Sequence, residues 1–508
     1  MRAPKISKSF ARFIAIRALM ALLLFLTLAA WSMGSAVGSS NDEDFILTTI
    51  WCGSSGTTGE TPYCQPDPNN FPKMIVPGLV AEPEGCFAAV LAGNYASAAC
   101  QKGLSDEEFS TDRYDRGYYP QGYPNMMRTF VEADVEKSVF KMRLFNSLLA
   151  AVLITLVFSI KQQSVRDSQL IWMAVVTPMA LYHIGSVHNS SWTFTGTTCF
   201  VVISMAILRN RKIRKLWAPL TFCLLIAIWL TISSRSEGKY ALILLAGLTL
   251  ISEFPPKNLV LSKKSVLIVF AAVVVAIIIY QRFPWFRSEE VFNLERVVPE
   301  KVFPHTANDL LLNNFLSLPS YFLSFFGSLG LGYPVLNLAP TIWLFSLLAT
   351  MLLMSFAVHN SLKIHRVGFY FALSFLCLVI LFFHQGSLYE VNAEISPRYF
   401  MPLFIGIVLI ASNNKNVPYP KLLVIAVAVL STISNSVAMR ETIRRYVTGQ
   451  DVYSFKSLNN GREWWWNFGP QPETVWLTGT LAFAALWALL IYDRNKNEVE
   501  APNSPAPE

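Results

Sequence analysis

The chain has 508 residues, of which 53% are hydrophobic and only 15% are charged, and its formal net charge is +8. Soluble domains carry about 25% charged residues, so this composition excludes an ordinary soluble protein and indicates an all-α integral membrane protein. The basic residues concentrate in short loops, as the positive-inside rule expects for cytoplasmic loops, and no basic patch interleaved with aromatic residues suggests nucleic-acid binding.

Hydropathy predicts about 12 membrane-spanning helices, and segments that hydropathy does not assign clearly widen the range to roughly 11 to 13. Residues 1–35 are a basic cytoplasmic segment and the first span, 13–35, for which a cleaved signal peptide is the alternative. Residues 36–141 form a long polar loop domain. Helices two to seven are expected within residues 142–281, at 142–160, 169–187, 192–208, 216–233, 238–254 and 265–281. Helices eight to eleven are expected within residues 340–439, at 340–358, 367–385, 399–412 and 421–439. The last helix is expected at 475–492.

Charged loops fix the expected orientation of these spans. The basic stretches "RNRKIRK" and "LKIHR", together with the disordered tail 493–508, belong on the cytoplasmic side. The loops 36–141, 282–339 and 440–474 therefore face outward. Within the second of these loops, the apolar stretch 308–334 contains a proline and several glycines. It is predicted to be a re-entrant or interfacial helix, or alternatively a further span.

Four of the seven cysteines lie in the first outward loop, where they indicate disulfides and an oxidising compartment. Three pairings are possible. We favour Cys52–Cys64 and Cys86–Cys100, because each of these bonds closes a short local loop. A zinc site is the alternative, but the spacings contain no C-x-x-C pair.

Three carboxylates follow the first expected span, in the stretch "SSNDEDFILTTIWC" (39–52). A solvated start of the loop is the simplest explanation for Asp42, Glu43 and Asp44. The alternative is catalysis, since a carboxylate can act as a general base on a hydroxyl or help to hold Mg²⁺ or Mn²⁺. We therefore treat all three as candidate catalytic residues. The sequence fixes no cofactor, and the metal ion stays an open alternative.

Polar residues in tight outward turns share one shallow layer with this acidic cluster. His188 and Asn189 follow the third span, Arg235 and Lys239 follow the fifth, and Arg398 precedes the tenth. Outward cations run against the positive-inside trend, which makes them candidates for function. Cations can stabilise a phosphate leaving group, so the three basic residues are candidate phosphate ligands. His188 and Asn189 are candidate substrate-binding residues.

Tyrosines near the same layer are further candidates for binding a substrate. Tyr119 lies in a stretch rich in tyrosine and charge, 112–130, whose aromatic faces suit a carbohydrate. An amphipathic lid at the membrane surface is the alternative explanation for this stretch. Tyr399 follows Arg398 directly and is the second tyrosine candidate.

Four short motifs, in this order, resemble a family of bacterial multi-pass membrane proteins called DUF2142. The motifs are "NDEDF" (41–45), "YYPQGYP" (118–124), "HNSSW" (188–192) and "SPRYFMPL" (396–403), and the resemblance covers most of the chain. Asn41 and Gln121 stand where the family commonly has proline, and "HNSSW" lacks the proline of the family's turn. These departures bear on local backbone shape more than on chemistry.

The DUF2142 family is similar to the GT-C superfamily of glycosyltransferases, which are polytopic enzymes with a catalytic Asp or Glu in the first outer loop. The resemblance implies a GT-C-like fold, a polyprenyl-phosphate donor, Asp42 as the catalytic carboxylate and Arg398 as a phosphate ligand.

We therefore expect a glycosyltransferase of the bacterial plasma membrane whose active face is extracytoplasmic. It would move a sugar from a polyprenyl-phosphate donor to an envelope glycan acceptor, with the lipid bilayer as its third partner. A transporter or flippase of lipid-linked sugars is one alternative, which predicts inverted repeats and charges near the bilayer midplane. A polysaccharide polymerase or ligase with a diphosphate-linked donor is another, and it needs no single carboxylate base.

Overall fold

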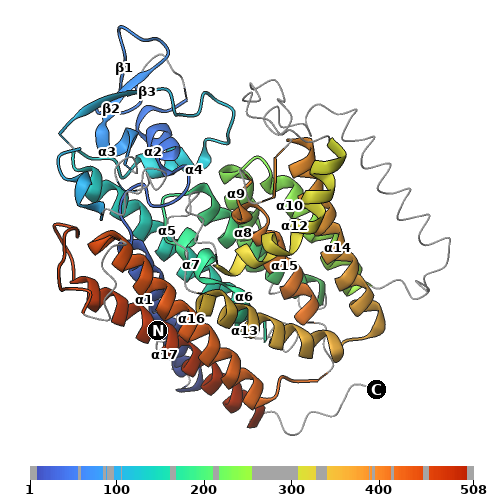
Figure 1. Ribbon diagram of the computed structural model, residues 1–508. Helices are drawn as coiled ribbons and strands as arrows, with labels where there is room; N and C mark the ends of the chain where they lie inside the picture. Colours follow the sequence, from blue (N-terminus) through green and yellow to red (C-terminus); the bar gives the residue numbers. More distant parts are fainter. Residues whose placement is uncertain are drawn as a thin grey trace, which may run out of the picture.

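The protein is mostly helical, with a small sheet at one end of a helix bundle (Figure 1). The computed structural model describes residues 8–54, 59–83, 87, 97–104, 106–160, 167–209, 217–254, 307–327, 340–387, 389–391, 395–413, 417–449 and 457–499. The part of the chain between α1 and α5, called the loop domain below, carries the strands and sits at one end of the bundle.

Among the described residues, 7 helices are long and apolar enough to cross a membrane. Two shorter apolar helices are α9 (Trp217–Ser234) and α15 (Met401–Ser412), and α10 (Gly238–Glu253) and α12 (Ala307–Gly327) also belong to the bundle. The expected span 265–281 lies outside the described residues. The 7 spanning helices are α1 (Lys8–Met33), α5 (Val135–Phe158), α8 (Asn189–Arg209), α13 (Pro340–His359), α14 (Lys363–Gly386), α16 (Lys421–Thr448) and α17 (Pro472–Val499).

The segment expected to form one span at 169–187 consists of two short helices in succession rather than one continuous helix. Helix α6 (Ser168–Val175) ends before Thr177, whose side chain accepts a hydrogen bond from the Ala180 N–H and so caps α7 (Pro178–Ile184). Proline at the first position of α7 has no N–H to satisfy. Hydropathy does not distinguish a continuous apolar helix from two short helices joined in this way.

Helices from both ends of the chain pack together on one side of the bundle. Figure 1 shows α1, α16 and α17 side by side, and α1 also contacts α5. Small residues permit this close approach, because a Cβ at Gly479 of α17 would lie 2.6 Å from Ala30 of α1 and 2.7 Å from Met439 of α16. The N-terminal helix is thereby fixed between segments that are distant in sequence.

The described part of the loop domain contains an antiparallel three-stranded sheet, three short α-helices and the 3₁₀ helix η2 (Ala98–Gln101). The strands β1 (Gln65–Pro66), β2 (Met74–Pro77) and β3 (Glu108–Thr111) pair in the order β1-β2-β3, with Ile75 opposite both Gln65 and Ser110. The α-helices are α2 (Glu43–Cys52), α3 (Gly78–Ala81) and α4 (Gly122–Arg128).

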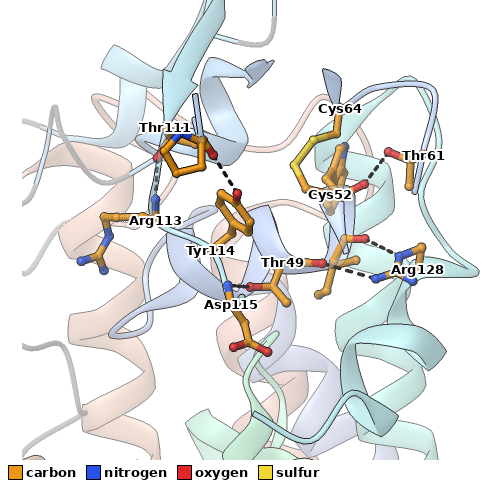
Figure 2. The surroundings of a disulfide bond; sticks show 12 residues. Thr49, Cys52, Thr61, Cys64, Thr111, Arg113, Tyr114, Asp115 and Arg128 are labelled. Atoms are coloured by element: carbon orange, nitrogen blue, oxygen red, sulfur yellow. Dashed lines mark hydrogen bonds between the residues drawn. A yellow bond between two sulfur atoms is a disulfide. The ribbon is translucent and has the colours of Figure 1, made fainter. Parts of the chain in front are cut away.

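A disulfide holds the end of α2, and it confirms the expected pairing of Cys52 with Cys64 (Figure 2). Cys100 is also disulfide-bonded, while its expected partner Cys86 lies outside the described residues. Arg128 donates to the carbonyls of Ile50, at 2.8 Å, and Thr49, at 3.4 Å, which caps the C-terminal end of α2. Helix α2 is therefore anchored at the end opposite its three carboxylates.

Candidate functional site

The three consecutive carboxylates at the start of α2 face three different arginines. Asp42 pairs with Arg398, Glu43 with Arg143 and Asp44 with Arg113. Among the residues that the structure describes, no group of three or more His, Cys, Asp or Glu side chains is placed to hold a metal ion. The carboxylates are thus arranged as ion pairs with guanidinium groups.

The Glu43–Arg143 pair is buried and connects α5 to the start of α2. Both side chains are 0% exposed, and their nearest charged atoms are 2.9 Å apart. Arg143 also donates to the carbonyls of Ser32 (3.0 Å), Ser35 (2.7 Å) and Ala36 (2.7 Å). One arginine thereby satisfies carbonyls at the C-terminus of α1 and fixes the backbone that leads into α2.

Asp42 has an unusual backbone conformation that turns its side chain away from α2. Its φ of 57° and ψ of 21° lie in the left-handed region, and it is the one non-glycine residue with positive φ in the described chain. Aspartate is among the few side chains that tolerate this region. Asp42 occupies the N-cap position of α2 but makes no side-chain capping bond, and its carboxylate accepts from Arg398 instead.

The Asp42–Arg398 pair joins a half-exposed anion to a buried cation. The Asp42 side chain is 49% exposed and that of Arg398 only 1%. Arg398 lies in the 3₁₀ helix η7 (Pro397–Tyr399), and it also donates to the Asn41 carbonyl at 3.0 Å. The second carboxylate oxygen of Asp42 lies 3.6 Å from Arg113, which donates to Asp44 at 3.0 Å. Asp42 therefore keeps an accessible carboxylate within a cationic setting.

The surroundings of Asp42 act on its pKa in opposite directions. Burial raises it, whereas the charge and hydrogen bond of Arg398, followed by the charges of Arg113 and Arg235, lower it. The cations dominate, so the pKa of Asp42 falls below its ordinary value of 3.8. At neutral pH this residue is a carboxylate.

A second arginine lies beside Arg398 and shares an aromatic neighbour with it. The guanidinium carbon of Arg235 is 4.1 Å from the ring centroid of Tyr399, and that of Arg398 is 5.2 Å from the same centroid. Arg235 donates to the Ser190 hydroxyl at 3.1 Å and pairs with Glu237 at 3.4 Å. These contacts hold two cations close together and in defined orientations.

Two histidines border this pair of cations. The Nδ1 atom of His188 accepts from the Ser190 N–H at 2.9 Å. Burial, and then the charge of Arg398, holds the pKa of His188 well below its usual range, so the ring is neutral. Its centroid lies 5.6 Å from that of His183, which is fully buried and has no hydrogen-bond partner at either ring nitrogen within the described part of the chain.

The remaining predicted site residues lie around this centre. Asn189 begins α8, next to His188, and its buried side-chain oxygen has no partner among the residues described. Lys239 is in the first turn of α10, with its ammonium 5.2 Å from the Tyr240 ring centroid. Tyr119 packs edge-on against Phe45 of α2, with ring centroids 5.8 Å apart.

Sequence reasoning missed three residues of this region: Arg143, Arg113 and His183. A signal existed for two of them, because an ionisable residue inside or at the edge of an expected span is a candidate for function. His183 falls inside the expected span 169–187, and Arg143 directly follows the start of the expected span at 142. Arg113 had no such signal, since charged residues are ordinary in a polar loop.

The fold and the site define a multi-pass helical membrane protein in which a carboxylate of the loop domain meets arginines at the end of the helix bundle. The chain belongs to the DUF2142 family, whose model, described as "Predicted membrane protein (DUF2142)", matches residues 25–407. The match includes both Asp42 and Arg398. No curated protein and no solved structure shows significant similarity to the chain.

Proposed function

We propose that this protein is a glycosyltransferase of the GT-C kind in the bacterial plasma membrane. It moves a sugar from a polyprenyl-phosphate donor to an envelope glycan acceptor on the extracytoplasmic face. The observation that carries the proposal is the contact between Asp42, half exposed and ionised, and Arg398, buried and fixed. A base that is reachable and a cation that is held in place are the two groups that such a transfer requires.

In the proposed step, Asp42 removes the proton from an acceptor hydroxyl, whose oxygen attacks the anomeric carbon of the donor. The bond between that carbon and the phosphate oxygen breaks, and the polyprenyl phosphate leaves with the electron pair. Arg398 and Arg235 stabilise the charge that develops on the leaving phosphate. Both are already oriented by Asn41, Ser190 and the Tyr399 ring, so little rearrangement is needed.

Donor binding would also strengthen the base. In the structure Arg398 lowers the pKa of Asp42, so the free carboxylate is a weak base. A phosphate that takes hydrogen bonds from Arg398 weakens this interaction and adds a second anion nearby. Both effects raise the pKa of Asp42 toward a value that suits general-base catalysis. The carboxylate thus becomes an effective base when the donor is present.

The neighbouring residues have supporting roles in this proposal. The Glu43–Arg143 pair holds the backbone that carries Asp42, and Asp44 holds Arg113 beside it. His188 and Asn189 contact the substrate from the turn that starts α8, Tyr119 contacts it from the loop domain, and Lys239 is a further phosphate ligand.

The disulfide supports an extracytoplasmic position for the loop domain, because disulfides persist in oxidising compartments. With the loop domain outside, the proposed topology has about 12 spans with a GT-C-like arrangement, counted by hydropathy. The polyprenyl chain of the donor then lies in the bilayer while its phosphate reaches Arg398.

The test is sugar transfer by the purified protein in liposomes that contain a lipid-linked donor. Asp42→Asn keeps the shape of the side chain and tolerates the left-handed backbone, but it cannot accept the proton. We expect the variant to fold and its transfer rate to fall by about 10²–10⁴-fold, the usual contribution of a general base.

Asp106→Asn is the matched control, because Asp106 is an exposed carboxylate of the same loop domain and lies outside the stretch 112–130. It should keep the wild-type rate. A folded Asp42→Asn variant with full activity would overturn the assignment of the base. Movement of the lipid-linked sugar across the bilayer without transfer to an acceptor would instead favour a transporter.

A further inference from the structure

Three buried polar side chains of the helix bundle have no role in the step described above. They are His183 of α7, Tyr321 of α12 and His384 of α14, and each is 0% exposed. Both ring nitrogens of His183, the Tyr321 hydroxyl and Nε2 of His384 have no hydrogen-bond partner among the described residues. Buried polar atoms in native proteins nearly always have partners, so such a group calls for an explanation.

The three side chains come from three different helices, and α12, which carries Tyr321, contacts both of the others. The Tyr321 ring lies 5.1 Å from His384 and 6.1 Å from Phe400, which follows Tyr399 directly. Helix α12 contacts both η7 and α7. On the other side, His183 is linked to Arg235 through His188 and Ser190. Tyr321 thus lies on a helix in contact with the segment that carries Arg398, while His183 is connected to Arg235.

The hydrogen-bonding character of the group is that of neutral donors and acceptors. Nδ1 of His384 is 2.8 Å from the Ile380 carbonyl, which can only accept, so Nδ1 carries the proton and Nε2 is an acceptor. The Tyr321 hydroxyl can donate or accept, and a neutral His183 ring offers one donor and one acceptor. Anions prefer the nearby guanidinium groups, whereas these side chains suit alcohol groups.

Aromatic faces surround these polar atoms. The His183 ring is stacked on Phe194 with an interplanar angle of 10° and a centroid separation of 6.4 Å. Tyr321 also packs edge-on against Phe325, with centroids 5.8 Å apart. Neutral hydrogen-bonding groups set among aromatic rings match a sugar ring, which has hydroxyls at its edge and apolar C–H faces.

We propose that His183, Tyr321 and His384 form the subsite for the sugar ring of the lipid-linked donor, whose phosphate lies on Arg398 and Arg235. The inference rests on the proposed function and adds to it the part of the protein that distinguishes a sugar-bearing lipid phosphate from a bare one. Sugar hydroxyls would satisfy the buried polar atoms, so truncating one of these atoms removes selectivity for the sugar and leaves phosphate binding intact.

The test measures the affinity of the full-length protein in nanodiscs for two kinds of probe. One probe is undecaprenyl phosphate, and the others are its glucose-, mannose- and N-acetylglucosamine-linked forms. Tyr321→Phe removes one buried oxygen and keeps the ring. Tyr370→Phe makes the same change at an exposed position of α14 and serves as the control. Arg398→Gln reports on phosphate binding.

We expect the wild-type protein to bind one of the sugar-linked lipids about tenfold more tightly than the bare lipid phosphate. Tyr321→Phe should remove this preference without changing the affinity for undecaprenyl phosphate, and Tyr370→Phe should change neither. Arg398→Gln should weaken the binding of every probe. His183→Phe should also remove the preference and leave the affinity for undecaprenyl phosphate unchanged. Because His183 lies on α7 and Tyr321 on α12, agreement between the two variants excludes a local distortion of one helix as the cause.

Two results would overturn the inference, and they differ in what they say of the proposed function. If the protein binds undecaprenyl phosphate through Arg398 but prefers none of the sugar-linked forms, the sugar subsite is wrong and the phosphate site stands. If it binds none of the four lipids, the proposed function fails together with the subsite.

Discussion

Asp42 and Glu43 are neighbours of the same chemical type, but their surroundings give them different roles. Asp42 is half exposed, whereas Glu43 is buried and also accepts from the Ser40 N–H at 3.1 Å. Sequence alone grouped both as candidate catalytic residues, because side-chain direction depends on the backbone turn at Asp42. The left-handed backbone conformation of Asp42 directs the two carboxylates into different surroundings, and no local sequence pattern predicts it.

Glu43→Gln should destabilise the protein strongly. It leaves the Arg143 guanidinium buried without a counter-ion, and breaking such a pair typically costs about 3–5 kcal/mol. The apparent Tm of the detergent-solubilised protein, followed by tryptophan fluorescence, measures the loss. Glu108→Gln, at an exposed position of β3, is the control and should leave the Tm unchanged. A Glu43→Gln variant as stable as the wild type would show that the pair does not hold the backbone.

The Asp42–Arg398 pair should contribute stability that depends on pH. The pKa of Asp42 is lowered in the folded protein, so its contribution is present above the ordinary value of 3.8 and is lost as the pH falls through the lowered value. Because Asp42 is half exposed, we expect less than about 1 kcal/mol. The Tm difference between wild type and Asp42→Asn should be similar at pH 7 and pH 5 and smaller at pH 3. A difference that grows on acidification would contradict the pairing.

Among the helices, α8 and α9 approach each other closely at a glycine. A Cβ at Gly196 of α8 would lie 2.7 Å from the Ala227 carbonyl oxygen of α9, so the two backbones would have to separate. Gly196→Ala should destabilise the protein by about 1–3 kcal/mol. At Gly247 of α10 a Cβ meets nothing within 4 Å, so Gly247→Ala should be neutral or slightly stabilising. Equal Tm values for both variants would show that α8 and α9 are not in contact as described.

Long spans were predictable from the sequence because a continuous apolar run of about 20 residues matches the thickness of the hydrocarbon core of a bilayer. This holds for the 7 candidate spans among the described residues. The break between α6 and α7 was not predictable, because it depends on a threonine cap and a proline inside an equally apolar run. The start of α5 at Val135 was missed because hydropathy counts Glu136, Lys137 and Lys141 against a span, although they lie in the first turns of the helix.

At the level of the whole molecule, the candidate site forms where the loop domain meets the end of the bundle. Asp42 and Arg398 are separated by 356 residues in the chain, and the sequence could place them only in the same layer of the membrane surface. The predicted topology gives the depth of each residue along the membrane normal. Which residues are neighbours within the membrane plane depends on how the helices pack. His183 and Tyr321 show the limit most clearly, because their proximity to Arg398 depends on how α7 and α12 pack around η7.

The central claim is that Arg398 changes partners, from Asp42 to the phosphate of a lipid donor. A cryo-electron microscopy structure of the protein in nanodiscs with undecaprenyl phosphate tests this most directly. We predict that phosphate oxygens lie within hydrogen-bond distance, about 2.7–3.2 Å, of both Arg398 and Arg235, and that the Asp42 carboxylate is released from Arg398. A phosphate bound elsewhere, with the Asp42–Arg398 pair intact, would contradict the claim and leave that pair a purely structural contact.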